Sequence, residues 1–271
     1  MTRFLKMHGL GNDFVVFDAR NRGLVLSPAQ AKAIADRRLG VGCDQVIVIR
    51  SSTGVDADMQ IFNSDGGEVE SCGNASRCVA RLLMDEKNTK QISISTQGGL
   101  LLCTDAGGGN VTVDMGAPEL TWDKIPLARP ADTNAFTLNV DGDEFNVAAL
   151  SVGNPHCVLF VDDAEKEAVS ALGPRIENHP MFPSRVNVEF VSAKSRSHLR
   201  MRVWERGVGI TQACGTGACA VAVAAVRRGL AERKMDIELD GGTLNLEWRE
   251  ADGHILMTGP STLVFKGEID L

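Results

Sequence analysis

Short apolar segments, separated by glycine, asparagine and charged residues, recur along the whole chain. They are rich in β-branched and aromatic side chains, a composition typical of strands. The predicted strands lie at residues 3–8, 14–18, 45–50, 57–62, 91–96, 100–103, 110–115, 157–161, 186–191, 199–204 and 263–266. Paired glycines at Gly98-Gly99 and Gly241-Gly242 predict hairpin turns between strands. We expect the last strand to return to the first half of the chain.

Helical patterns interrupt the strands at a few places. Residues 29–38 follow a Ser27-Pro28 start signal, and residues 74–86, 164–172 and 216–228 are the other predicted helices. The segment 216–228 is almost entirely alanine, valine and cysteine, so it is apolar on every face. A helix of that kind is buried on all sides. We therefore expect a central helix wrapped by a sheet.

Two halves of the chain repeat the same order of polar and apolar positions. The segment that ends in Cys72-Gly73-Asn74 recurs 142 residues later and ends in Cys214-Gly215-Thr216. The same offset relates Asn12 to Asn154, Gln45 to Asn187 and Asn63 to Glu205, and it slips to 143 at the paired glycines. A diverged duplication with one small insertion explains the constant offset of 142 residues and its slip to 143.

The repeat and the element order together predict the fold class. Strands outnumber helices and do not alternate with them, so a Rossmann arrangement fits poorly. We predict an α+β protein of two pseudo-symmetric domains, each a strongly curved, mainly antiparallel sheet around one central helix. The predicted domains are residues 1–116, with the returning strand at 262–271, and residues 117–261.

Composition narrows the functional classes. The 271 residues are 44% hydrophobic and 23% charged, as in globular proteins, and the net charge of −7 argues against nucleic acid or an anionic membrane as the main partner. We find no apolar stretch long enough to cross a bilayer and no signal-peptide pattern at the start, so we expect a cytoplasmic protein with a small-molecule substrate. The seven cysteines are expected to be thiols, most of them in the core.

Cys72 and Cys214 each precede a glycine and a predicted helix. Free N–H groups and the dipole at a helix start attract negative charge, which lowers the pKa of a thiol and offers donors to a carboxylate. If the two halves face each other, a substrate Cα would lie between two thiols. One thiolate could remove its proton while the other thiol donates one, which inverts the centre by acid–base catalysis. This chemistry requires no cofactor and no metal.

At these residues the sequence resembles the diaminopimelate epimerase family. The similar motifs are Lys6-Met-His-Gly-Leu-Gly-Asn-Asp-Phe14, the run from Asp36 to Gln45, and the two cysteine segments. The resemblance covers essentially the whole chain. It implies cofactor-independent interconversion of LL- and meso-2,6-diaminopimelate, on the route to lysine and peptidoglycan, by a homodimer.

The resemblance also implies residue roles. Cys72 and Cys214 are the expected acid–base pair, with His156 and Glu205 assisting. Gly73, Asn74, Gly215 and Thr216 are expected to hold the reacting carboxylate. The remaining substrate-binding residues would be Asn12, Gln45, Asn63, Asn154, Asn187, Glu205 and Arg206. Cys43, Ala75 and Ile210 depart from the family pattern without removing a functional group.

Two alternatives remain. A proline-type racemase also works between two cysteines, but that family has His where this chain has Asn74, and a ring substrate has little use for Glu205 and Arg206. A thiol redox or metal-binding protein is the rival of another class. The intervals from Cys72 to Cys78 and from Cys214 to Cys219 are not the C-x-x-C spacing of such proteins.

Overall fold

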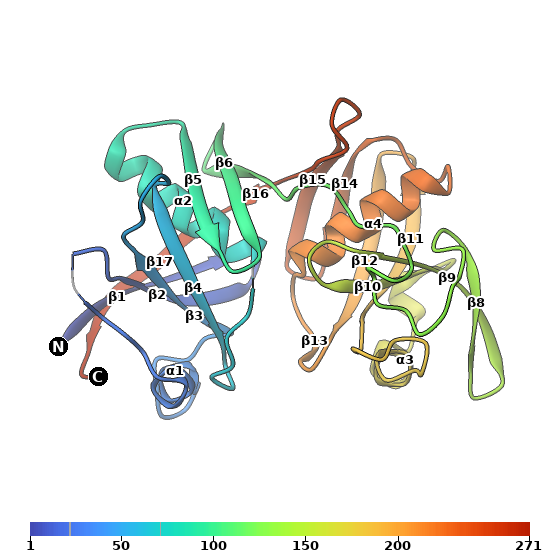
Figure 1. Ribbon diagram of the computed structural model, residues 1–271, viewed down its shortest axis with the longest axis horizontal. Coiled ribbons are helices and arrows are strands. Elements are labelled where there is room, and N and C mark those ends of the chain that lie inside the picture. Colours follow the sequence, from blue (N-terminus) through green and yellow to red (C-terminus); the bar gives the residue numbers. More distant parts are fainter. Residues whose placement is uncertain (22, 71) are drawn as a thin grey trace. The chain divides into compact units, whose positions relative to one another are not determined.

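The computed structural model describes residues 1–21, 23–70 and 72–271 (Figure 1). The chain divides into two compact units. Unit 1 comprises residues 1–114 and 258–271, and unit 2 comprises residues 115–257. Both units consist mainly of strands with few helices, so the predicted α+β class is confirmed.

Unit 1 is built on a curved, mainly antiparallel sheet. Its strands are β1 (Thr2–Gly9), β2 (Asn12–Asp18), β3 (Gln45–Arg50), β4 (Ala57–Asn63), β5 (Gln91–Thr96), β6 (Gly99–Gly107), β7 (Asn110–Asp114) and β17 (Thr262–Ile269). They pair in the order β17-β1-β2-β3-β4-β5-β6-β7. The β2–β3 and β4–β5 pairs are parallel, and the other pairs are antiparallel.

Unit 2 repeats this arrangement. Its strands are β8 (Phe136–Val140), β9 (Asp143–Ser151), β10 (Pro155–Phe160), β11 (Asn187–Ser195), β12 (His198–Glu205), β13 (Gly209–Ile210), β14 (Lys234–Leu239) and β15 (Gly242–Trp248), followed along the chain by β16 (Ile255–Pro260). They pair in the order β8-β9-β10-β11-β12-β14-β15, with β13 also beside β12. The parallel pairs of unit 2 are β10–β11 and β12–β14. They occupy the same places in the strand order as the parallel pairs β2–β3 and β4–β5 of unit 1.

Strand register repeats with the same offset as the sequence. Phe14 lies opposite Gln45 in unit 1, and His156 lies opposite Asn187 in unit 2. Because both partners are shifted by 142 residues, the offset found in the sequence relates equivalent positions of the two units.

One long helix lies against the sheet in each unit. These are α2 (Gly73–Lys87), which contacts β1, β5, β6 and β7, and α4 (Gly215–Arg227), which contacts β9, β10, β11, β12, β14 and β15. All residues of α4 from Gly215 to Ala225 are buried. Figure 1 shows α4 lying across the strands of its unit, so the prediction of a central helix is confirmed there. Among the described residues, the helices are too short or too polar to cross a membrane.

Two predicted helices have different bounds in the structure. The helix expected at 29–38 is α1 (Pro28–Ala35), because the Asp36 carboxylate accepts hydrogen bonds from the backbone N–H groups of Arg38 and Leu39 and forms a turn. The helix expected at 164–172 is a short 3₁₀ turn (Ala164–Lys166) followed by α3 (Val169–Glu177).

The position of α3 follows from what it packs against. Gly173 of this helix lies directly against the ring of Trp204, and any larger residue at 173 would overlap the ring. Val169, Gly173 and Ile176 form the buried face of the helix, which therefore continues past Leu172. At its last residue, Glu177 accepts a hydrogen bond from Trp204 Nε1 at 2.7 Å.

Candidate functional site

The first half-site consists of Cys72 with Asn12, Gln45, Asn63, Gly73 and Asn74, all in unit 1. Cys72 is the N-cap residue of α2, and its Sγ accepts a hydrogen bond from the Ala75 N–H at 3.5 Å. The same Sγ lies 3.9 Å from Asn12 Oδ1, which also accepts from Asn74 Nδ2 at 3.1 Å. The thiol, the helix start and the first residue of β2 are thus joined.

Gln45 and Asn63 form the second linked pair of the first half-site. They lie opposite each other on β3 and β4, and Gln45 Nε2 donates to Asn63 Oδ1 at 3.0 Å. Gln45 Oε1 is buried and accepts no hydrogen bond from the described residues. This oxygen is therefore an acceptor that a ligand could use.

A charged cluster that the sequence reasoning missed supports Asn12. Asn12 Nδ2 donates to Asp44 Oδ2 at 2.9 Å, and Arg37 bridges Asp44 and Asp13. Lys6 completes the cluster by pairing with Asp13 at 2.5 Å. Burial alone would raise the pKa of Asp13, but hydrogen bonds from Arg37 and Lys6 outweigh it and lower that pKa from 3.8 to about 2. The sequence did contain a signal for the two aspartates of this cluster, because Asp13 directly follows Asn12 and Asp44 directly precedes Gln45.

The second half-site consists of Cys214 with Asn154, His156, Asn187, Glu205, Arg206, Gly215 and Thr216, all in unit 2. Cys214 is the N-cap residue of α4, and its Sγ accepts from the Gly217 N–H at 3.3 Å. Burial raises the pKa of Cys214 well above its usual value, and Glu205 and Glu189 raise it further, against the lowering by Gly217 and Thr216. The direction is opposite to the one expected from the helix start alone, because the thiol is only 5% exposed.

A continuous hydrogen-bonded chain runs from Cys214 into the interior of unit 2. Thr216 Oγ1 lies 3.6 Å from Cys214 Sγ and accepts from Asn154 Nδ2 at 3.3 Å. Asn154 Oδ1 is 2.9 Å from His156 Nε2, and His156 Nδ1 is 2.7 Å from Glu189 Oε1. Glu189 was missed by the sequence reasoning, although a single carboxylate inside the apolar run 186–191 was a visible signal.

The remaining residues of the second half-site lie on and after the end of β12. Asn187 Oδ1 accepts from the backbone N–H of Arg206 at 2.9 Å, and Arg206 Nη1 donates to the Ser184 carbonyl at 3.1 Å. Thr211 Oγ1 donates to the Glu205 carboxylate. Glu177, also missed from sequence, accepts from the N–H of Gly207 at 2.9 Å and so holds the turn that carries Arg206.

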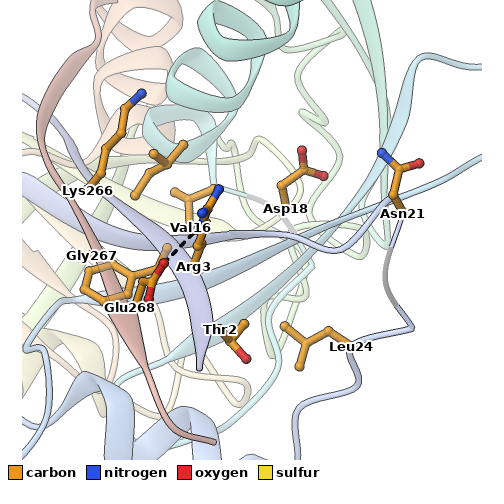
Figure 2. Close-up of a pocket in the computed structure, with 11 residues that line it drawn as sticks. Thr2, Arg3, Val16, Asp18, Asn21, Leu24, Lys266, Gly267 and Glu268 are labelled. Atoms are coloured by element: carbon orange, nitrogen blue, oxygen red, sulfur yellow. Dashed lines mark hydrogen bonds and ion pairs between the residues drawn. The ribbon is translucent and has the colours of Figure 1, made fainter.

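A cavity of about 680 Å³ in unit 1 lies away from the predicted residues. Figure 2 shows its wall, where Arg3 of β1 and Glu268 of β17 point toward each other and form an ion pair at 3.1 Å. The cavity is lined by Thr2, Arg3, Phe4, Leu5, Val16, Asp18, Asn21, Leu24, Lys266, Gly267 and Glu268. None of these residues belongs to either half-site.

Within the described part of the chain, no three His, Cys, Asp or Glu side chains are grouped so that they could hold a metal ion.

Comparisons with known proteins agree on one family. The family model described as diaminopimelate epimerase matches residues 4–121 and 148–264. The diaminopimelate epimerase of Acidiphilium cryptum is 54% identical over 267 residues, which cover 98% of this chain and 96% of that protein. The diaminopimelate epimerase of Stutzerimonas stutzeri is 47% identical over 275 residues, with both chains covered completely.

Solved structures with low sequence identity share the fold. A phenazine biosynthesis protein of the PhzF family from Bacillus anthracis has a TM-score of 0.72 at 15% identity, and covers 100% of this chain and 99% of its own. A probable proline racemase from Agrobacterium radiobacter has a TM-score of 0.70 at 16% identity, with coverage of 100% and 93%. At such identities the likeness concerns the fold alone.

Proposed function

Because the chain belongs to the diaminopimelate epimerase family, we propose that it converts LL-2,6-diaminopimelate to meso-2,6-diaminopimelate by inversion at one Cα. The reaction would serve lysine and peptidoglycan precursor biosynthesis. The observation that carries the proposal is the pair of N-cap cysteines, one at the start of the central helix of each unit.

In the proposed mechanism, Cys72 and Cys214 act from opposite faces of the substrate Cα. One sulfur removes the proton as thiolate, and the other donates a proton as thiol. The backbone N–H groups at Gly73-Asn74 and Gly215-Thr216 would bind the carboxylate and stabilise its developing charge. The raised pKa of Cys214 suits this residue to the role of proton donor in its buried state.

The other amino acid head of the substrate would be bound by polar side chains that flank the cysteines. Arg206 would hold its carboxylate through the guanidinium, and Glu205 would contact an ammonium group. Asn12, Asn63, Asn154 and Asn187 would supply further hydrogen bonds, and Gln45 has a free buried acceptor to offer. His156 would assist near the reacting centre through Asn154 and Thr216.

The proposed organisation follows the same reasoning. Residues 1–116 with 262–271, and residues 117–261, would be two domains that enclose the substrate and exclude water during proton transfer. The enzyme would need no cofactor and would act in the cytoplasm as a homodimer.

A direct assay tests the proposed function. The reduced protein is incubated with LL-diaminopimelate, and the stereoisomers are separated by chiral chromatography. We expect conversion to the meso form, and a loss of conversion in the single variants Cys72→Ala and Cys214→Ala. Racemisation of proline without conversion of diaminopimelate would contradict the proposal and favour the racemase alternative.

A further inference from the structure

The two units differ beneath the catalytic helix starts. In unit 2, three positions around the first turn of α4 are occupied by His156, Glu189 and Gly217. The 142-residue offset places Phe14, Ile47 and Ala75 at the equivalent positions of unit 1, where all three are fully buried. Unit 1 therefore adopts the same fold with three apolar residues at these positions. The fold itself does not require His156 and Glu189.

Burying His156 and Glu189 costs free energy. His156 and Glu189 are both 0% exposed, and Glu189 Oε2 has no hydrogen-bond partner among the described residues. Burying a carboxylate is unfavourable unless an opposite charge and hydrogen bonds compensate it. The compensation available is His156 Nδ1 at 2.7 Å from Glu189 Oε1, together with the N-terminus of α4.

Gly217 makes this close approach possible. A Cβ at position 217 would lie 2.9 Å from Glu189 Oε1 and 3.2 Å from Cys214 Sγ. The carboxylate therefore lies directly against the helix turn whose N–H binds the thiol. The matching residue of unit 1 is Ala75, which carries a Cβ, and positions 14 and 47 of that unit hold Phe14 and Ile47 in place of the charged pair.

The hydrogen-bond pattern fixes the direction of the chain. Both ring nitrogens of His156 face oxygen acceptors, the Glu189 carboxylate and the Asn154 amide oxygen. The two contacts fix the orientation of the His156 ring and of the Asn154 amide. Asn154 then donates to Thr216 Oγ1, which leaves the Thr216 hydroxyl proton free to point at Cys214 Sγ, 3.6 Å away.

We propose that Glu189 is a positioning residue of the epimerisation, which holds the His156 ring so that Asn154 and Thr216 present their donors toward Cys214. This role rests on the proposed function. The Glu189 carboxylate also acts on two buried thiols, because it raises the pKa of both Cys157 and Cys214. Unit 1 has no counterpart of the pair at positions 14 and 47, so the support acts on one thiol of the two.

The test combines a spectroscopic and a kinetic measurement. Protein labelled with ¹⁵N in its histidines is studied by NMR near neutral pH, and the His156 signal is assigned with the variant His156→Gln. We expect the ¹⁵N shift of His156 Nδ1 to change in Glu189→Gln, because the carboxylate that contacts this nitrogen is lost. If Glu189→Gln is poorly folded, Glu189→Asp replaces it; this variant keeps a carboxylate and should give shifts closer to those of the wild type.

Kinetics with diaminopimelate then separates positioning from a structural role. We expect Glu189→Gln to lower kcat by about tenfold or more, with KM nearly unchanged. Glu165→Gln is the matched control, because Glu165 is an exposed carboxylate of the same unit that pairs with Arg200 and belongs to neither half-site, so this variant should leave kcat and KM unchanged. Unchanged His156 ¹⁵N shifts in Glu189→Gln, or a Glu189→Gln variant with the wild-type kcat, would overturn the proposal. If the wild type does not convert diaminopimelate, the proposed function fails, while the NMR result still decides whether Glu189 holds the His156 ring.

Discussion

The substitution Gly217→Ala probes the contact between the helix turn and the buried carboxylate. The added Cβ would lie 2.9 Å from Glu189 Oε1, whereas non-bonded atoms prefer a separation of about 3.5 Å. The carboxylate or the helix must therefore move by roughly 0.5 Å, and Glu189 has no exposed space to enter. Displacements of about 1 Å in a catalytic arrangement can lower rates by roughly 100-fold. We expect kcat to fall by about 10- to 100-fold.

Stability should respond differently from activity. Alanine is favoured over glycine inside a helix by about 1 kcal/mol, which offsets part of the steric cost. We therefore expect the free energy of unfolding, measured by urea denaturation, to change by no more than about 2 kcal/mol while kcat collapses.

A double-mutant cycle gives the control. If Gly217→Ala acts by displacing Glu189, it should have much less effect in the Glu189→Gln background than in the wild type, because the two residues are in contact. Wild-type kcat in Gly217→Ala, or losses that simply multiply in the double variant, would refute this reasoning.

Three further predictions concern other parts of the two units. Asp13→Asn should lower the free energy of unfolding by about 1–2 kcal/mol near neutral pH, since this carboxyl is half-buried and partly screened. Because folding lowers its pKa from 3.8 to about 2, the contribution is present above pH 3.8 and disappears as the pH falls toward 2, so urea titrations of wild type and variant should converge there. Glu177→Gln should raise KM more than it lowers kcat and should change Trp204 fluorescence, because Glu177 binds both the indole and the turn after β12; equal effects on kcat and kcat/KM with unchanged KM would contradict this. Iodoacetamide should modify the half-buried Cys72 before Cys214, whose pKa is raised by burial, and peptide mass mapping that finds Cys214 modified first would disprove it.

The repeat was the most informative part of the sequence for the fold. Matched residues at a constant offset predicted two similar units, and the apolar run after Cys214 predicted the buried helix α4. Both signals are local or periodic, so they are visible without tertiary structure. The strand pair β8–β9 was missed although Asp141-Gly142 at its turn is a typical hairpin sequence, with both residues at positive φ.

The supporting residues of the site were beyond sequence reasoning for a physical reason. Glu189 contacts His156 across two parallel strands, 33 residues apart in the chain, and Glu177 reaches Gly207 from a helix whose extent was itself mispredicted. Their roles depend on which side chains fold against them. The N-cap cysteines were predictable because a cap depends only on its own next few residues.

Isotope exchange during turnover tests the two-thiol mechanism most directly. The reduced enzyme is given LL-diaminopimelate in D₂O, and the deuterium content of the remaining substrate and of the meso product is measured at low conversion. A thiol that has exchanged with solvent should deliver deuterium to the product, while the residual substrate keeps its original Cα hydrogen, because removal and delivery occur at different sulfurs. Early deuterium in the residual LL substrate, at a rate matching product formation, would mean that a single base serves both faces and would contradict the account.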